Sequence, residues 1–246
     1  MDFVDEECFD DWKRKGYCLG VDDFLVTIKY KSIKEKASHS IGDFLTMAEV
    51  IVNFIMLAEH KQKTTNQYAF DEEFFLLKEI ILDGLTRYNQ RVVYDDELEQ
   101  ALIIEDKPEV TAVAEIAEPQ IARAVIRYNH HTLKGDIDAK KAILLMLASE
   151  LEPQRRLLKS INSELEDSIF YMLNNMNLRH NNTEIGDKNY HKAVAEMGPK
   201  ELEQWYDELY QMMLLAKLLI DNKPRQEKTK MLKAGLSEKP SHETKN

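Results

Sequence analysis

The sequence predicts an all-α protein in which an N-terminal helical region precedes an up-down four-helix bundle. Gly and Pro account for only 8 and 6 of the 246 residues, whereas residues that favour helices, such as Leu, Ala, Glu and Lys, are plentiful. Apolar side chains recur at the spacing of an amphipathic helix in several stretches. Hydrophobic residues make up 43% and charged residues 31% of the chain, a composition typical of globular proteins.

The N-terminal region is expected to contain three helices and one segment whose structure the pattern leaves open. Residues 24–30 fit either a short strand or a turn of helix. Residues 40–59 carry apolar side chains along one stripe and are expected to be helical. Asp71 can cap a second helix that continues through Leu85, because an acidic first turn follows it. A shorter helix is expected over residues 95–104.

The distribution of charge divides the chain. The first 120 residues hold 26 acidic and 13 basic side chains, and the remainder hold 18 and 20, giving net charges of −13 and +2. The acidic part should repel a polyanion, whereas the second part should tolerate one. After Asn222, seven basic residues stand against three acidic ones, which is typical of a disordered basic tail. The expected parts are an acidic helical domain (1–115), a four-helix bundle (116–222) and a disordered tail (223–246).

The bundle is expected to consist of four amphipathic helices joined by short loops, the sequence order of an up-down bundle. Pro119 suits the first turn of the first helix, and Asp136 can cap the second. Pro153 either kinks the second helix or starts a new segment. The expected helices cover residues 119–129, 136–151, 163–176 and 199–220.

Polar and basic residues gather where the third of these helices ends and in the loop that follows. An up-down order places the ends of helices one and three beside the starts of helices two and four. One pole of the bundle should therefore collect the candidate site residues, which are His130, His131, Arg179, His180, Asn181, Asn182, Tyr190 and His191.

These groups suit the cleavage of RNA by transesterification, which needs a deprotonated 2′-hydroxyl, a protonated leaving oxygen and a stabilised phosphorane. A histidine can act as base or acid near neutral pH, and an arginine can bind the phosphate through its guanidinium. The residues alone also fit a second interpretation. Arg179 and His180 would then form a charged C-terminal helix cap, with Asn181 ending the helix.

Residues 136–220 resemble a HEPN domain, a family of helical bundles found in toxins, abortive-infection proteins and other phage-defence systems. Three features carry the resemblance. A helix rich in small and apolar residues covers 139–151, an amphipathic helix ends at Arg179-His180-Asn181, and a loop bearing His191 leads into a long last helix.

The resemblance implies an RNA-binding protein or a metal-independent endoribonuclease that forms a homodimer, with two motifs sharing one cleft. Arg179 would contact phosphate and His191 would take part in acid–base catalysis. In many members the histidine follows the arginine by about four to six residues, whereas eleven residues separate Arg179 from His191. Either His180 takes over this role, or the loop folds His191 back. The candidates for substrate binding are Asn181, Asn182, Tyr190, His130 and His131.

Other classes of protein are less favoured. The chain has no phosphate-binding loop, dinucleotide fingerprint or zinc-protease motif, and neither a cofactor nor a metal is expected. The longest apolar run, residues 142–148, is far shorter than the roughly 20 residues of a membrane span. An acidic start and only two cysteines fit a cytoplasmic protein. The alternative function is a non-catalytic all-helical interaction or scaffold protein with a degenerate HEPN-like bundle.

Overall fold

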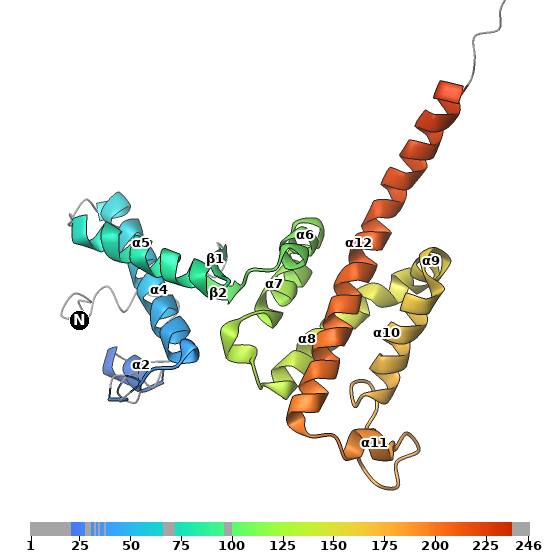
Figure 1. Cartoon of the computed structure of the whole chain (residues 1–246), viewed down its shortest axis with the longest axis horizontal. Coiled ribbons are helices and arrows are strands. Elements are labelled where there is room, and N and C mark those ends of the chain that lie inside the picture. The colour runs from blue at the N-terminus through green and yellow to red at the C-terminus, as the bar shows by residue number, and fades with distance from the viewer. Residues whose placement is uncertain are drawn as a thin grey trace, which may run out of the picture. The chain divides into compact units, whose positions relative to one another are not determined.

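The computed structural model describes residues 21–27, 31, 33, 35–36, 38–65, 72–95 and 100–237. This part of the chain is mostly helical, with one small two-stranded sheet (Figure 1). The predicted all-α class is therefore correct in the main, and the sheet is the exception. The chain forms two compact units. The first comprises residues 1–106 and 129–134, and the second comprises 107–128 and 135–246.

The first unit is built from helices and a β-hairpin. Within the segment 24–30, which the sequence pattern left open, residues 24–27 are helical, whereas residues 28–30 lie outside the described part of the chain, as does the expected cap Asp71. Ser40 and Asp43 cap α4 reciprocally, because Asp43 N donates to Ser40 Oγ and Ser40 N donates to Asp43 Oδ2. A hydrogen bond from Lys36, together with those from Ser40, holds the pKa of Asp43 below its usual range. The elements are α2 (Val21–Thr27), α4 (Ile41–Thr65), α5 (Glu72–Arg87), β1 (Gln90–Asp95), β2 (Gln100–Glu105) and the short 3₁₀ helix η2 (His131–Leu133).

The prediction of a helix over residues 95–104 was wrong. The chain forms an antiparallel hairpin instead, with Val92 opposite Ile103 and Val93 opposite Leu102. Both strands are rich in β-branched residues, which pack well on a pleated surface and lose side-chain freedom in a helix. The hairpin covers the apolar stripes of two helices. The buried core of this unit joins Leu45, Ala48 and Val52 of α4, Ile81 and Leu85 of α5, and Ala101 and Ile103 of β2.

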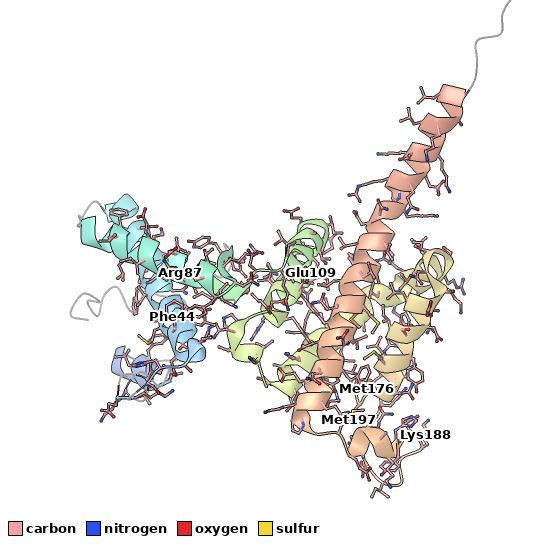
Figure 2. All side chains as sticks on the ribbon, in the orientation of Figure 1. Phe44, Arg87, Glu109, Met176, Lys188 and Met197 are labelled. Atoms are coloured by element: carbon pink, nitrogen blue, oxygen red, sulfur yellow. The ribbon has the colours of Figure 1, made fainter. Side chains whose placement is uncertain are left out.

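Helices α4 and α5 approach closely near Phe44, which is labelled in Figure 2. A Cβ added at Gly84 would lie 3.1 Å from the Phe44 ring, so a larger residue would require the ring to shift by a few tenths of an ångström. The same ring also lies 5.8 Å from that of Tyr88, measured between centroids. Glycine at this position thus leaves room for the Phe44 ring between the two helices.

Two polar side chains of α4 bind the edge of β2 that does not face β1. Asn53 Nδ2 donates to Ala101 O and Asn53 Oδ1 accepts from Ala101 N, both at 2.8 Å. Glu49 Oε2 accepts from Ile103 N, also at 2.8 Å. Both α4 side chains are almost fully buried. They lie one helical turn apart, so they meet alternate residues of the strand. Backbone groups that another strand would pair in a larger sheet are thus paired by a helix.

The described part of the second unit contains the four expected helices, three further α-helices and one short 3₁₀ helix. Pro119 begins α7, and the Asp136 side chain accepts from Ala139 N at the start of α8, as predicted. The segment that starts near Pro153 is a 3₁₀ turn followed by α9. The long helix α12 packs against α6, α8, α9 and α10. The elements are α6 (Pro108–Ile116), α7 (Pro119–Tyr128), α8 (Ile137–Leu151), η3 (Glu152–Gln154), α9 (Arg155–Ile161), α10 (Ser163–Asn175), α11 (Lys192–Ala195) and α12 (Pro199–Ser237).

The helix ends of this unit meet as an alternating order requires. Tyr128 Oη, at the end of α7, donates to Asp207 of α12 at 2.9 Å. Gly135 N, just before α8, donates to Glu203 Oε1 at 2.7 Å. Tyr206 Oη donates to the carbonyl of Met176, which follows α10, at 3.1 Å. The first turns of α12 therefore contact the ends of α7 and α10 and the start of α8.

Two boundaries differ from those expected. The second unit begins at residue 107, because α6 packs on α7 and α12, whereas the sequence placed the division at 115–116. Residues 223–237, expected to be disordered, continue α12, and residues 238–246 lie outside the described part of the chain. Ion pairs one turn apart support this exposed helix, among them Lys223–Glu227 at 3.4 Å. In the described residues, no helix combines the length and apolar character needed to cross a bilayer.

Candidate functional site

The chain reverses direction directly after α10. The helix ends at Asn175 and Met176 forms its C-cap. Asn177 adopts the left-handed conformation, with φ of 56°, which asparagine tolerates better than most residues. Arg179 N then donates back to Leu173 O at 3.0 Å. The helix thus ends six residues before Asn181, and Arg179 lies in the loop beyond it, whose start and later part are marked by Met176 and Lys188 in Figure 2.

Asn182 closes the loop that follows. This residue is fully buried. Its Oδ1 accepts from Asn177 N at 2.8 Å, and its Nδ2 donates to Asn189 O at 2.7 Å. Its backbone carbonyl accepts from His191 N at 2.9 Å. Residues 183–190 therefore form an excursion that returns to its starting point.

The closed loop matters for the separation of Arg179 and His191 along the chain. Eleven residues separate Arg179 from His191 in sequence, but His191 is hydrogen-bonded to Asn182, three positions after Arg179. If the excursion is left out of the count, His191 follows Asn182 directly. The loop thus returns the backbone at His191 to Asn182.

Arg179 is engaged in an ion pair and a cation–π contact. Its guanidinium pairs with Glu152 of η3 and lies 5.4 Å from the centre of the Phe170 ring. Arg155 lies 4.1 Å from the same ring and 2.5 Å from Glu166, which is buried. The hydrogen bond from Arg155 holds the pKa of Glu166 below its usual range. Arg179 therefore belongs to a network of alternating charges around Phe170, and its side chain is 25% exposed.

His191 is exposed and has one defined side-chain partner. Its Nε2 lies 2.9 Å from Asn175 Oδ1. The Asn175 amide is oriented by its own Nδ2, which donates to Tyr171 O at 2.8 Å. An amide oxygen can only accept, so Nε2 of His191 carries the hydrogen and Nδ1 is the basic nitrogen. Sequence reasoning missed Asn175, although Asn174-Asn175 inside a helix, where asparagine is disfavoured, was an available signal.

The other predicted loop residues differ in exposure. His180 is exposed and Tyr190 is half-buried. Asn181 is exposed, and its Oδ1 accepts from Glu184 N and Thr183 N, each at 3.2 Å. Its side chain thereby forms the turn that starts the excursion. Asn182, expected to bind substrate, is fully buried and holds the loop closed.

His130 and His131 were expected at the same pole, but they belong to the first unit. There His130 Nε2 lies 2.7 Å and His131 Nε2 3.5 Å from Glu49 Oε2. The eight predicted site residues therefore divide into six on the 179–191 segment of the second unit and two in the first.

The contacting helix ends of the second unit bring together a different set of charges. Lys140 is almost fully buried and lies 2.7 Å from both Glu203 and Asp207. Burial, reinforced by Asp207, raises the pKa of Tyr128 above its usual range, and the ring stacks on Tyr210 with centroids 4.0 Å apart. These groups satisfy one another, so this cluster stabilises the packing of α7, α8 and α12.

Comparison with known proteins identifies no family for this chain. No family model matches it, and neither does any curated protein or solved structure.

Proposed function

We propose that this protein binds RNA through the 179–191 segment and cleaves it by metal-independent transesterification, the activity that its HEPN resemblance implies. The observation that supports the proposal is the hydrogen bond between His191 N and Asn182 O. It closes off residues 183–190, and if these are left out of the count, His191 is the fourth residue after Arg179. The spacing of the motif in the fold thus agrees with the family pattern better than the spacing in sequence.

The chemistry assigns one step to each group. His191 Nδ1 takes the proton of the 2′-hydroxyl, whose oxygen attacks phosphorus and displaces the 5′-oxygen. His180 gives the proton that the leaving oxygen needs, so the products are a 2′,3′-cyclic phosphate and a 5′-hydroxyl. Arg179 stabilises the phosphorane charge. Glu152 is 46% exposed as a side chain, so a phosphate can compete with it for the guanidinium.

We expect cleavage of a structured RNA, in the presence of a chelator, to depend on both main residues. His191→Ala should lower the single-turnover rate by about 100-fold or more, the usual contribution of general acid–base catalysis. Arg179→Ala should lower it by a similar factor. The matched control is Arg156→Ala, which removes an exposed arginine of the same unit. Cleavage by wild type that survives in both variants would show that a contaminant or another site is responsible.

The same assay tests the position of His191. In Asn175→Asp a carboxylate replaces the amide beside Nε2 and favours the charged imidazole. The acidic limb of the pH–rate profile should then move to higher pH, whereas a purely structural role for Asn175 would lower the rate without moving the profile.

The proposal includes a homodimer, because two motifs facing each other across a two-fold axis would complete one cleft. We expect sedimentation velocity at micromolar concentration to give twice the mass of the 28.7 kDa chain. Mixing Arg179→Ala with His191→Ala protein should then restore part of the activity if the site is composite. A monomer at these concentrations excludes the composite site.

The second candidate is a non-catalytic interaction or scaffold protein. The contact that favours it is the ion pair between Arg179 and Glu152, which makes the arginine part of the folded network. On this interpretation wild type does not cleave, and Arg179→Ala lowers the thermal midpoint without affecting any RNA.

A further inference from the structure

The first unit contains a cluster of ligand atoms to which the proposed cleavage site assigns no role. Glu49 is 1% exposed in the middle of α4. His130 and His131 reach it from the segment 129–134 and are nearly as buried, with 11% and 7% of their side chains exposed. One oxygen of Glu49 and one nitrogen of each histidine lie within 4.8 Å of one another. We propose that these three residues bind a divalent transition-metal ion.

The second observation concerns His131. Its Nε2 is buried and makes no hydrogen bond with any residue in the described part of the chain. The nitrogen points toward the cluster, since Glu49 Oε2 lies 3.5 Å away, a distance too long for a good hydrogen bond. Leaving a buried polar atom without a partner is costly, and such atoms in native structures call for an explanation. A metal ion bound to this nitrogen supplies the missing partner.

Neighbouring groups orient two of the three ligands. His130 Nδ1 lies 2.7 Å from Thr132 Oγ1, which can hold the ring with Nε2 toward Glu49. Glu49 Oε2 accepts from Ile103 N at 2.8 Å, which fixes the carboxylate. Metal-binding histidines usually donate their other nitrogen to such a partner, and this support raises their affinity. In this cluster Thr132 is such a partner for His130.

The ligand chemistry selects the class of ion. Two imidazoles and one carboxylate suit zinc, cobalt or nickel, whereas calcium and magnesium prefer oxygen ligands alone. Such an ion joins α4 to a segment that returns to this unit only after residues 107–128. Its main effect is to stabilise the first unit, so binding is independent of any activity at the 179–191 segment.

The test uses the full-length, tag-free protein after treatment with a chelator. Zinc titrated against a chromophoric competitor should bind with one equivalent of high affinity, and zinc should raise the thermal midpoint. His131→Gln should weaken binding by more than about 100-fold, beyond the effect of losing a supporting residue. The control His39→Gln removes an exposed histidine of the same unit and should bind like wild type. A Cys8→Ser/Cys18→Ser variant should also keep the site.

Two further readouts keep the proposal testable if His131→Gln does not fold. Thr132→Val, which only removes the support of His130, should weaken zinc binding by about 10- to 100-fold. Cobalt bound to wild type should give visible d–d absorption that is lost in Glu49→Gln. Folded wild type that binds neither ion at micromolar concentration overturns the proposal, as does His131→Gln protein that binds as tightly as wild type.

Discussion

The Asn53→Ala variant should lose about 2–4 kcal/mol of unfolding free energy, because it removes both hydrogen bonds between the buried Asn53 amide and the buried backbone of Ala101. Ala101 is fully buried, and both its N–H and its carbonyl are paired with the Asn53 amide. Losing a hydrogen bond at a buried group costs about 1–2 kcal/mol when water cannot replace it. Water cannot take the place of the amide without disturbing the core around α4 and β2, so the two lost bonds together account for the expected range.

Chemical denaturation followed by far-UV circular dichroism measures this loss. Hydrogen–deuterium exchange adds a local readout, because residues 100–105 should exchange faster in the variant. Thr86→Ala is the control. It removes an exposed hydroxyl of α5 that bonds only within its own helix, and its effect should stay within about 0.5 kcal/mol. Equal stability of Asn53→Ala and wild type would mean that the edge of β2 is not held by α4.

Much of the fold was predictable because the sequence signals of a helix lie within the helix itself or next to it. The apolar stripes, Asp136 as a cap and Pro119 at a helix start depend on residues a few positions apart, which the sequence displays directly. The hairpin could not be recognised from residues 95–104 alone, because its first strand, β1, covers residues 90–95. Only the two segments together show the paired β-branched residues of an antiparallel ladder.

Contacts between distant residues were not predictable. Glu49 and His130 are 81 positions apart, and nothing local distinguishes Glu49 from the other charged residues of its helix. His130 and His131 were expected with the bundle because they follow α7 directly. It could not reveal that residues 129–134 leave the second unit and pack with the first.

In the candidate site, the residue types were predictable but their roles depended on the fold. Arg179 and His191 were identified from the sequence as the chemically capable groups. Asn182 was expected to bind substrate, because its amide can orient a phosphate or an imidazole. It is buried instead, and it closes the excursion. This role depends on residues 177 and 189, and no local pattern in the sequence shows that they meet.

The second large effect is expected on replacing Asn182, the residue that closes the loop between Arg179 and His191. Asn182→Ala removes both side-chain hydrogen bonds that hold the loop, to Asn177 N and Asn189 O, and leaves a small buried space. We expect a loss of about 2–3 kcal/mol, since each net hydrogen bond contributes about 1 kcal/mol and unsatisfied buried groups add to it. Without the closure, the backbone bond to His191 has no support, and residues 183–190 can move as an open loop.

The expected result is therefore twofold. Exchange of the 176–192 backbone should become faster while that of α8 stays slow, and RNA cleavage should fall by at least about tenfold because misplaced catalytic groups lose much of their effect. Asn182→Asp keeps the acceptor for Asn177 N, but it buries a carboxylate whose second oxygen faces Asn189 O, so it should open the loop at least as much as Asn182→Ala in both measurements. An Asn182→Ala protein with an open loop and full cleavage would show that His191 acts without the closure. In that case the short effective spacing to Arg179 is not what makes the site competent.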